Sequence, residues 1–300
     1  MINFSKYHGC GNDFIITREA EVSNKSYSEL AQAVCHRKIG IGADGLIIVK
    51  GRPVEDGLED GEDPLEMVFY NCDGSRAPMC GNGIRCFAKY CYDEEICTRK
   101  EYKIETLAGT MGVKVVETDP FLVEINMGKP IFTPETFGVD SAEKDFLKQT
   151  IMVDGEAVPV SSCFMGTVHT VIWLEELNQF AGGKAIDFKE GSKSYEMLEK
   201  LGKSIESHPV YKEKTNVNMV EVIDRNTLKL QTYERGVGMT LACGTGACAS
   251  LVIGALENKC MREVDVILPY GKLHITQKED GEVMMRGPAE KICQGTFSWI

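Results

Sequence analysis

The sequence lacks a long apolar run and a secretory signal pattern, and it has fewer basic residues than acidic ones. Each of these features excludes or disfavours a class of protein. It has no long apolar run and no basic N-terminal region followed by an apolar one, so we expect neither a membrane span nor a secretory signal. Its 33 lysine and arginine residues are fewer than its 45 acidic ones, and the net charge of −12 disfavours nucleic acid or an anionic membrane as a partner. The expected location is therefore the cytoplasm.

Cysteine is abundant, but its spacing excludes the usual structural uses. None of the 12 cysteines forms a Cys-x-x-Cys pair, so we expect no metal site. A disulfide framework is typical of short secreted chains, whereas 300 residues suffice for two domains that each bury a core. Cys35, Cys91, Cys163 and Cys260 lie in apolar patterns that are typical of packing residues, and we interpret Cys72 as a small buried residue too.

The clearest internal signal is a repeated motif. Met79-Cys80-Gly81-Asn82-Gly83 in the first half is echoed by Ala242-Cys243-Gly244-Thr245-Gly246 in the second. Each motif precedes a helical pattern, over about residues 83–92 and 246–257, so each cysteine stands just before a predicted helix N-terminus. The match extends upstream and downstream at nearly equal distances, to Tyr70-Asn71, Tyr233-Glu234, Gly109 and Gly271. The sequence therefore predicts a duplicated half with one cysteine in each copy.

The position of the two cysteines suggests a chemistry. Unpaired N–H groups at a helix start carry the positive end of the helix dipole, so they bind anions and lower the pKa of a nearby thiol. If two such starts bound one carboxylate, a thiolate on one face of the α-carbon could remove a proton while a thiol on the other face returned one. This exchange inverts a stereocentre without a cofactor. The pattern favours Cys80 and Cys243 as the two bases of a racemase or epimerase.

Three motifs in order resemble the signatures of the diaminopimelate epimerase family. They are the two cysteine motifs, continued by Ile84-Arg85-Cys86 and Ala247-Cys248, and the opening His8-Gly9-Cys10-Gly11-Asn12-Asp13-Phe14. The resemblance runs from Phe4 to Gly295. It implies an α/β fold of two pseudo-symmetric halves, each a curled, mostly antiparallel sheet around a central helix, with the active site in the cleft between them.

The resemblance also implies an activity. It predicts an isomerase that interconverts LL- and meso-2,6-diaminopimelate, in lysine and peptidoglycan precursor synthesis, without pyridoxal phosphate (PLP) or any other cofactor. We expect a homodimer whose substrate is a small molecule, an amino acid. Besides the catalytic cysteines, the residues expected to bind the substrate through side chains or backbone N–H groups are Asn12, Asn71, Gly81, Asn82, Thr167, His169, Asn216, Glu234, Arg235, Gly244 and Thr245. Asp44 is either close to the substrate or a structural turn residue.

Two departures from the family pattern leave the substrate open. Thr167 and Val168 replace the asparagine and proline of a Gly-Asn-Pro-His motif, in which the asparagine helps to hold the far end of diaminopimelate, and Met239 stands where the family usually has glutamate. A racemase of the same family for histidine or a basic amino acid is the alternative. Glu234 and Arg235 favour a substrate with two zwitterionic ends, since glutamate suits an ammonium group and arginine a carboxylate.

Two other classes compete with this interpretation. Gly244-x-Gly246-x-x-Ala249 fits a loose dinucleotide-binding pattern, with Glu263 near the place of a ribose-binding acid, but this pattern does not account for the copy at Cys80. Alternatively, the chain is a duplicated scaffold whose matched cysteines pack in an interface. The surrounding glycines argue against that scaffold because they leave little side-chain volume to fill a core.

The predicted boundaries follow from the repeat and from turn signals. We expect a first half over residues 1–127, a second half over 128–288, and a C-terminal strand over about 289–300 that returns to the first half. Helices are predicted from the Ser26 cap to Gly40, over Ser194 to Ile205, and, as a short helix, over Ser141 to Lys148. The acidic segment from Gly51 to Pro64 is predicted to be a loop.

Overall fold

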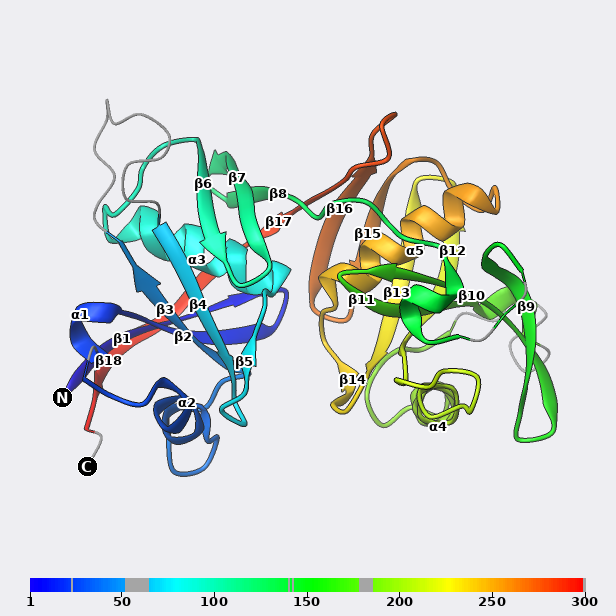
Figure 1. The fold of residues 1–300 in the computed structure, drawn as a ribbon, viewed down its shortest axis with the longest axis horizontal. Helices are drawn as coiled ribbons and strands as arrows, with labels where there is room; N and C mark the ends of the chain where they lie inside the picture. Colours follow the sequence, from blue (N-terminus) through cyan, green and yellow to red (C-terminus); the bar gives the residue numbers. More distant parts are fainter. Residues whose placement is uncertain (23, 52–64, 140, 142, 178–185, 299–300) are drawn as a thin grey trace. The chain divides into compact units, whose positions relative to one another are not determined.

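A computed structural model describes residues 1–22, 24–51, 65–139, 141, 143–177 and 186–298. The chain divides into two compact units, one formed by Met1–Asn126 with Arg286–Ile300 and the other by Met127–Met285 (Figure 1). Most of the predicted acidic loop, residues 52–64, lies outside the described residues. Among the described helices, none combines the length and apolar character needed to cross a membrane.

The first unit is a curled sheet in which the C-terminal strand returns to pair with the N-terminal strand. Its elements are β1 (Ile2–Gly9), β2 (Asn12–Arg18), α1 (Glu19–Val22), α2 (Tyr27–Cys35), β3 (Gly45–Lys50), β4 (Leu65–Asn71), β5 (Arg76–Ala77), α3 (Gly81–Asp93), β6 (Glu101–Thr106), β7 (Gly109–Thr118), β8 (Phe121–Asn126) and β18 (Glu290–Phe297). The β2–β3 and β4–β6 pairs are parallel, whereas β1–β2, β3–β4, β6–β7 and β7–β8 are antiparallel. β18 pairs antiparallel with β1, so the first and last strands of the chain lie side by side (Figure 1).

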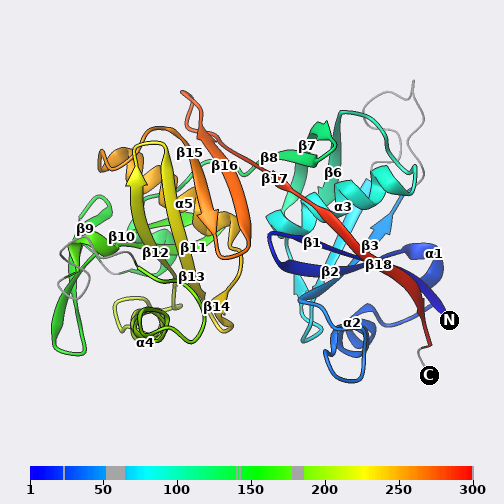
Figure 2. The same ribbon diagram turned by 180° about the vertical axis from the view of Figure 1, so that it is seen from behind.

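Helix α3 is enclosed by this sheet. It packs against β1, β2, β8 and β18, and ten of its 13 residues are buried (Figure 2). Even Arg85 is fully buried; its Nε donates to the Pro288 carbonyl at 3.1 Å and its Nη2 donates to Asn82 Oδ1 at 2.9 Å. Because its guanidinium satisfies both groups, Arg85 ties the start of α3 to the returning C-terminal chain.

The second unit repeats this arrangement. Its elements are η1 (Pro134–Phe137), β9 (Phe146–Val153), β10 (Glu156–Met165), β11 (Thr167–Trp173), η2 (Leu174–Glu176), α4 (Lys193–Glu206), β12 (Asn216–Asp224), β13 (Thr227–Glu234), β14 (Gly238–Thr240), α5 (Gly244–Leu256), β15 (Glu263–Leu268), β16 (Gly271–Gln277) and β17 (Val283–Pro288), whose last three residues belong to the first unit. The β11–β12 and β13–β15 pairs are parallel, and β9–β10, β10–β11, β12–β13 and β15–β16 are antiparallel.

Each pairing of the second unit has a counterpart in the first. Helix α5 packs against β10, β11, β12 and β16, so it occupies the place that α3 has in the first unit. The pattern confirms the expected α/β fold of two pseudo-symmetric halves, each a mostly antiparallel sheet around a central helix. Helix α5 carries no charged side chain, as expected for a helix that is enclosed on all sides.

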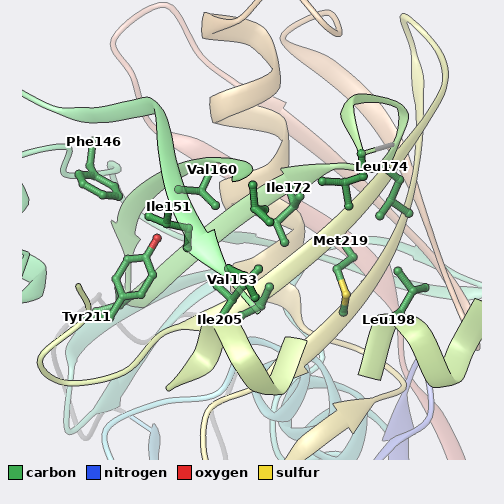
Figure 3. Packing of buried hydrophobic residues seen from close by; sticks show 14 of the residues in the cluster. Phe146, Ile151, Val153, Val160, Ile172, Leu174, Leu198, Ile205, Tyr211 and Met219 are labelled. Carbon is green, nitrogen blue, oxygen red and sulfur yellow. The ribbon is translucent and has the colours of Figure 1, made fainter. Parts of the chain in front are cut away.

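A second layer of helix covers the outer face of each sheet. Helix α2 packs on β3 and β4, and α4 packs on β12 and β13. In the second unit, Leu198 and Ile205 of α4 lie in one apolar cluster with Ile172 and Met219 of the sheet (Figure 3). Helix α4 begins at its Ser192 cap, whose hydroxyl accepts the Tyr195 N–H. These clusters hold the strands whose ends carry the candidate site.

Helix α2 ends earlier than the sequence indicated. It stops at Cys35 instead of continuing to Gly40, because His36 has an extended backbone with ψ of 117°. Ile39, which fitted the apolar stripe, is 83% exposed. The early end lets the Arg37 guanidinium reach Asp44 at 2.7 Å. A short-range ion pair therefore forms where the last predicted turn of the helix would lie.

The short helix predicted over Ser141 to Lys148 is wrong where the structure describes it. Phe146 begins strand β9, and Phe146, Ile151 and Val153 are buried along it. β9 covers the edge of β10 just as β18 covers the edge of β1. β9 and β10 form a hairpin across the two-residue turn Asp154-Gly155, in which both residues have positive φ, so the sequence analysis overlooked a local hairpin signal.

Candidate active site

The matched cysteines are the N-cap residues of the two enclosed helices. Cys80 precedes α3 and Cys243 precedes α5, and both have extended backbone dihedral angles. The helices begin at Gly81 and Gly244, two residues before the predicted starts. The first N–H groups of a helix have no acceptor within it, so each thiol stands beside a set of backbone donors. Such a position suits a bound carboxylate.

In the first unit, three candidate residues lie together. Asn12 Oδ1 accepts a hydrogen bond from Asn82 Nδ2 at 3.1 Å, and the Cys80 thiol donates to the same oxygen at 3.8 Å. Asp44 Oδ2 accepts from Asn12 Nδ2 at 2.6 Å, which fixes the orientation of that amide. Because Arg37 binds the other carboxylate oxygen, Asp44 acts here as a support for Asn12.

Asn71 belongs to the neighbouring turn. It lies opposite Gly45 at the end of β4, and its Nδ2 donates to Ser75 Oγ at 3.0 Å. The next residue, Cys72, is exposed, so the expectation that it would be buried is wrong. Its backbone is still held, because the Cys72 N–H donates to the Asp44 carbonyl at 3.0 Å.

In the second unit, the Cys243 sulfur is held at the start of α5. Gly246 N donates to Cys243 Sγ at 3.3 Å, and Thr245 Oγ1 lies 3.6 Å from it. The side chain is nearly buried, with 7% of the residue exposed. An N–H that points at sulfur stabilises its thiolate form.

The turn between β10 and β11 brings Thr167 to this helix start. A Cβ atom on Gly166 would lie 3.4 Å from Thr245 Cγ2. Thr167 Oγ1 lies 3.2 Å from His169 Nε2 and accepts from Asn216 Nδ2 at 2.8 Å. Thr167 is partly exposed, whereas the His169 side chain is fully buried behind it.

Glu234 and Arg235 follow at the end of β13. Glu234 Oε1 accepts from Thr240 Oγ1 at 2.7 Å, which orients the carboxylate. The Arg235 N–H donates to Asn216 Oδ1, and its Nη1 donates to the Glu213 carbonyl, both at 2.9 Å. The second unit thus gathers its predicted residues around the end of β13 and the start of α5.

Asn218 was missed by the sequence analysis. It is fully buried, donates to His169 Nδ1 at 3.1 Å, and accepts from Thr232 Oγ1 at 3.1 Å. The available signal was an asparagine within the apolar run of β12, on the same face as Asn216, because a buried amide in a strand requires hydrogen-bond partners.

The other cysteines differ from the N-cap pair. Cys35, Cys91, Cys163 and Cys260 are at most 3% exposed, which confirms them as packing residues. Burial raises the pKa of the Cys163 thiol to about 12 and that of Cys260 to about 11. These thiols stay protonated at neutral pH and are poor nucleophiles.

Burial also keeps His169 neutral, which predicts a pH dependence of stability. Desolvation lowers the pKa of His169 from 6.5 to about 3. The unfolded chain binds a proton at this histidine below its ordinary pKa, whereas the folded chain does not. The contribution is therefore complete above pH 6.5 and decreases as the pH falls toward 3, by ~1.4 kcal/mol per pH unit.

Urea unfolding between about pH 7.5 and about pH 4.5 measures this slope. We expect His169→Gln to unfold with a smaller loss of stability over this range than the parent chain. His36→Gln is the matched control because His36 is exposed at the end of α2. Equal slopes for His169→Gln and the parent would contradict the neutral, buried state of His169.

The dinucleotide-binding interpretation lacks its structural context. A dinucleotide-binding motif requires a parallel strand–helix–strand unit. The strand before α5 is β14, which pairs antiparallel with β13. Glu263 lies 3.0 Å from His274 Nε2 in a cross-strand pair. Among the described residues, no group of three or more His, Cys, Asp or Glu side chains is arranged to hold a metal ion.

Comparisons with known proteins extend over nearly the whole chain. The family model for diaminopimelate epimerase matches residues 4–133 and 163–292. A diaminopimelate epimerase from Alkaliphilus metalliredigens is 39% identical over 99% of this chain and 97% of its own length. One from Methanothermobacter thermautotrophicus is 34% identical over 98% of both chains.

Solved structures share the fold at low sequence identity. A probable proline racemase from Agrobacterium radiobacter K84 has a TM-score of 0.68 at 14% identity, with 99% of this chain and 93% of that chain covered. A hydroxyproline epimerase from Agrobacterium vitis has a TM-score of 0.64 at 12% identity, with 98% and 90% covered.

Proposed function

The chain belongs to the diaminopimelate epimerase family, a family of isomerases, and from this premise we propose that it interconverts LL- and meso-2,6-diaminopimelate. The observation that supports a two-thiol mechanism is the duplicated N-cap. Cys80 and Cys243 each precede an enclosed helix whose first turn presents backbone donors. In our proposal the two thiols act on opposite faces of one α-carbon.

The proposed reaction needs one base and one acid in each direction. One cysteine, as thiolate, takes the α-proton, and the electron pair of the broken C–H bond moves into the carboxylate. The other cysteine, as thiol, then donates its proton to the opposite face, and the two cysteines have exchanged protonation states. We propose that Cys80 and Cys243 swap these roles when the reaction direction is reversed.

Backbone donors stabilise the charge that develops on the carboxylate in this proposal. The N–H groups of Gly81, Asn82, Gly244 and Thr245 lie in the first turns of the two helices. A well-placed donor of this kind contributes roughly 3 to 4 kcal/mol to transition-state stabilisation. These donors take the place of a cofactor as the sink for negative charge, so we propose that the enzyme is PLP-independent.

We propose that the remaining polar residues bind the parts of the substrate other than the reacting α-carbon and its carboxylate. Asn12 and Asn82 are held next to Cys80, and Asn71 lies at the end of the adjoining strand. Thr167, Asn216, Glu234 and Arg235 are the candidates in the second unit. His169 is fully buried, so we assign it a positioning role behind Thr167. We further propose a homodimer in the cytoplasm, where a reducing environment keeps the 12 cysteines as thiols.

A substrate panel tests the assignment against a racemase for another amino acid. The enzyme is incubated in D₂O with LL-diaminopimelate, L-histidine, L-lysine or L-arginine, and α-deuteration is followed by NMR. We expect deuteration and formation of the meso epimer with diaminopimelate, and negligible exchange with the others. If histidine or a basic amino acid exchanged its α-proton faster than diaminopimelate, that amino acid would be the substrate and the proposed assignment would be wrong.

A further inference from the structure

We propose that the Thr167 hydroxyl can only donate, and not accept, a hydrogen bond toward the substrate, and that it donates to a substrate carboxylate. His169 and Asn216 impose this, because their hydrogen bonds occupy both lone pairs of the hydroxyl oxygen, and Asn218 sets the direction of the His169 bond. The proposal rests on the proposed function, because it concerns how the same site recognises its substrate. It assigns Asn218 and His169 as positioning residues that act through Thr167. The assignment follows from the hydrogen-bond partners of two buried amides.

The orientation of Asn218 is fixed by a backbone carbonyl. Asn218 Nδ2 donates to the Thr170 carbonyl at 3.2 Å, and since a carbonyl can only accept, the NH₂ group must face this side. The same nitrogen lies 3.1 Å from His169 Nδ1. Nδ1 must therefore accept, and in a neutral imidazole the proton then resides on Nε2.

The His169 ring passes this direction on to Thr167. Its Nε2 lies 3.2 Å from Thr167 Oγ1. Because Nε2 carries the ring proton, it is the donor, and the hydroxyl oxygen is the acceptor. The ring stays neutral because it is fully buried, with a pKa lowered to about 3 by desolvation. The direction of this bond therefore persists at physiological pH.

Asn216 is fixed in the same way from the other side. Its Oδ1 accepts the Arg235 N–H at 2.9 Å, and a backbone N–H can only donate. The NH₂ group must then face Val168 and Thr167, and Asn216 Nδ2 donates to the Val168 carbonyl at 2.9 Å and to Thr167 Oγ1 at 2.8 Å. Thr167 Oγ1 thus accepts a second hydrogen bond.

Two accepted hydrogen bonds use both lone pairs of a hydroxyl oxygen. The Thr167 hydroxyl can therefore only donate to a ligand. Thr167 is partly exposed, and the preceding Gly166 lies against Thr245 of the Cys243 helix start. A donor-only hydroxyl there favours an oxygen of a carboxylate and disfavours an ammonium group. The single O–H donor of Thr167 would thus select a substrate that presents a carboxylate oxygen at this place.

Two measurements test the proposal. In the first, Thr167→Val is compared with Thr167→Ser for diaminopimelate epimerisation. We expect Thr167→Val to raise KM ~10- to 100-fold with kcat within ~3-fold, because it removes a hydrogen bond to a charged group that exists before and during the reaction. Thr167→Ser should restore KM to within ~3-fold of the parent value because it keeps the hydroxyl. A Thr167→Val enzyme with an unchanged KM, or one that loses kcat alone, would overturn the proposal.

The second measurement uses the whole chain without substrate, so it is independent of activity. ¹⁵N NMR of histidine-labelled protein should show His169 as the Nε2–H tautomer, unchanged from about pH 6 to about pH 8. An Nδ1–H tautomer, or a ring that titrates in this range, would refute the inferred hydroxyl direction. If the parent enzyme failed to epimerise diaminopimelate, the proposed function would fall while this measurement still tested the direction of the hydroxyl.

Discussion

Cys80→Ala and Cys243→Ala are each expected to reduce the epimerisation rate at least ~10²- to 10⁴-fold, the range that a positioned acid or base contributes. Each variant lacks the base for one direction of the reaction and the acid for the other, so both directions are impaired. Water cannot easily replace the thiol of Cys243, because that residue is only 7% exposed. The measurement is the initial rate of meso-epimer formation from LL-diaminopimelate.

The remaining thiol gives a sharper prediction for these variants. A base that is still present can exchange the α-proton of the epimer that it faces, although inversion fails. Each variant is therefore expected to show residual hydrogen exchange with one epimer only, and the two variants with opposite epimers. Cys293→Ala, at an exposed position on β18, is the matched control and should keep the parent rate. Either N-cap variant at the parent rate would remove the two-thiol mechanism.

Gly246→Ala is expected to damage both stability and turnover, because Gly246 lies directly against the buried network. An added Cβ would lie 2.3 Å from Asn218 Oδ1 and 3.1 Å from Cys243 Sγ. Asn218 cannot retreat without breaking its bonds to His169 and Thr170. Overpacking of this kind costs ~1 to 3 kcal/mol of unfolding free energy. Displacement of Cys243 by about 1 Å would lower kcat/KM by ~10²-fold.

Gly112→Ala provides the control for this substitution. Gly112 lies in strand β7, and a Cβ there would have no atom within 4 Å. We expect this control to match the parent in urea unfolding and in turnover. If Gly246→Ala behaved like Gly112→Ala in both measurements, the close packing of Asn218 against the α5 start would be refuted.

The sequence carried the local features of the site. A cysteine followed by glycine before a helical pattern placed Cys80 and Cys243 at N-caps, and the structure has them there. Such positions can be predicted because capping depends on a few consecutive residues. The duplication could be recognised because the same cysteine–glycine motif before a helix occurs twice in one chain.

The errors have two origins. Two of them were local: β9 pairs with β10 across the two-residue turn Asp154-Gly155, a hairpin signal that the sequence analysis overlooked, and α2 ends at the extended His36 although the apolar stripe continues beyond it. Asn218 escaped notice because its importance comes from His169, which lies on another strand. The role of Asn218 thus depends on a contact distant in sequence, which no pattern within a short window contains.

The central claim is that the proton removed and the proton returned are carried by different thiols. The most direct test starts from each diaminopimelate epimer separately in D₂O and follows α-deuterium in substrate and product at early times. The two-thiol mechanism predicts that the product epimer carries deuterium at the inverted carbon while the recovered substrate remains protonated. A product that keeps the original hydrogen would show that a single base returns the proton it removed, and would contradict the account.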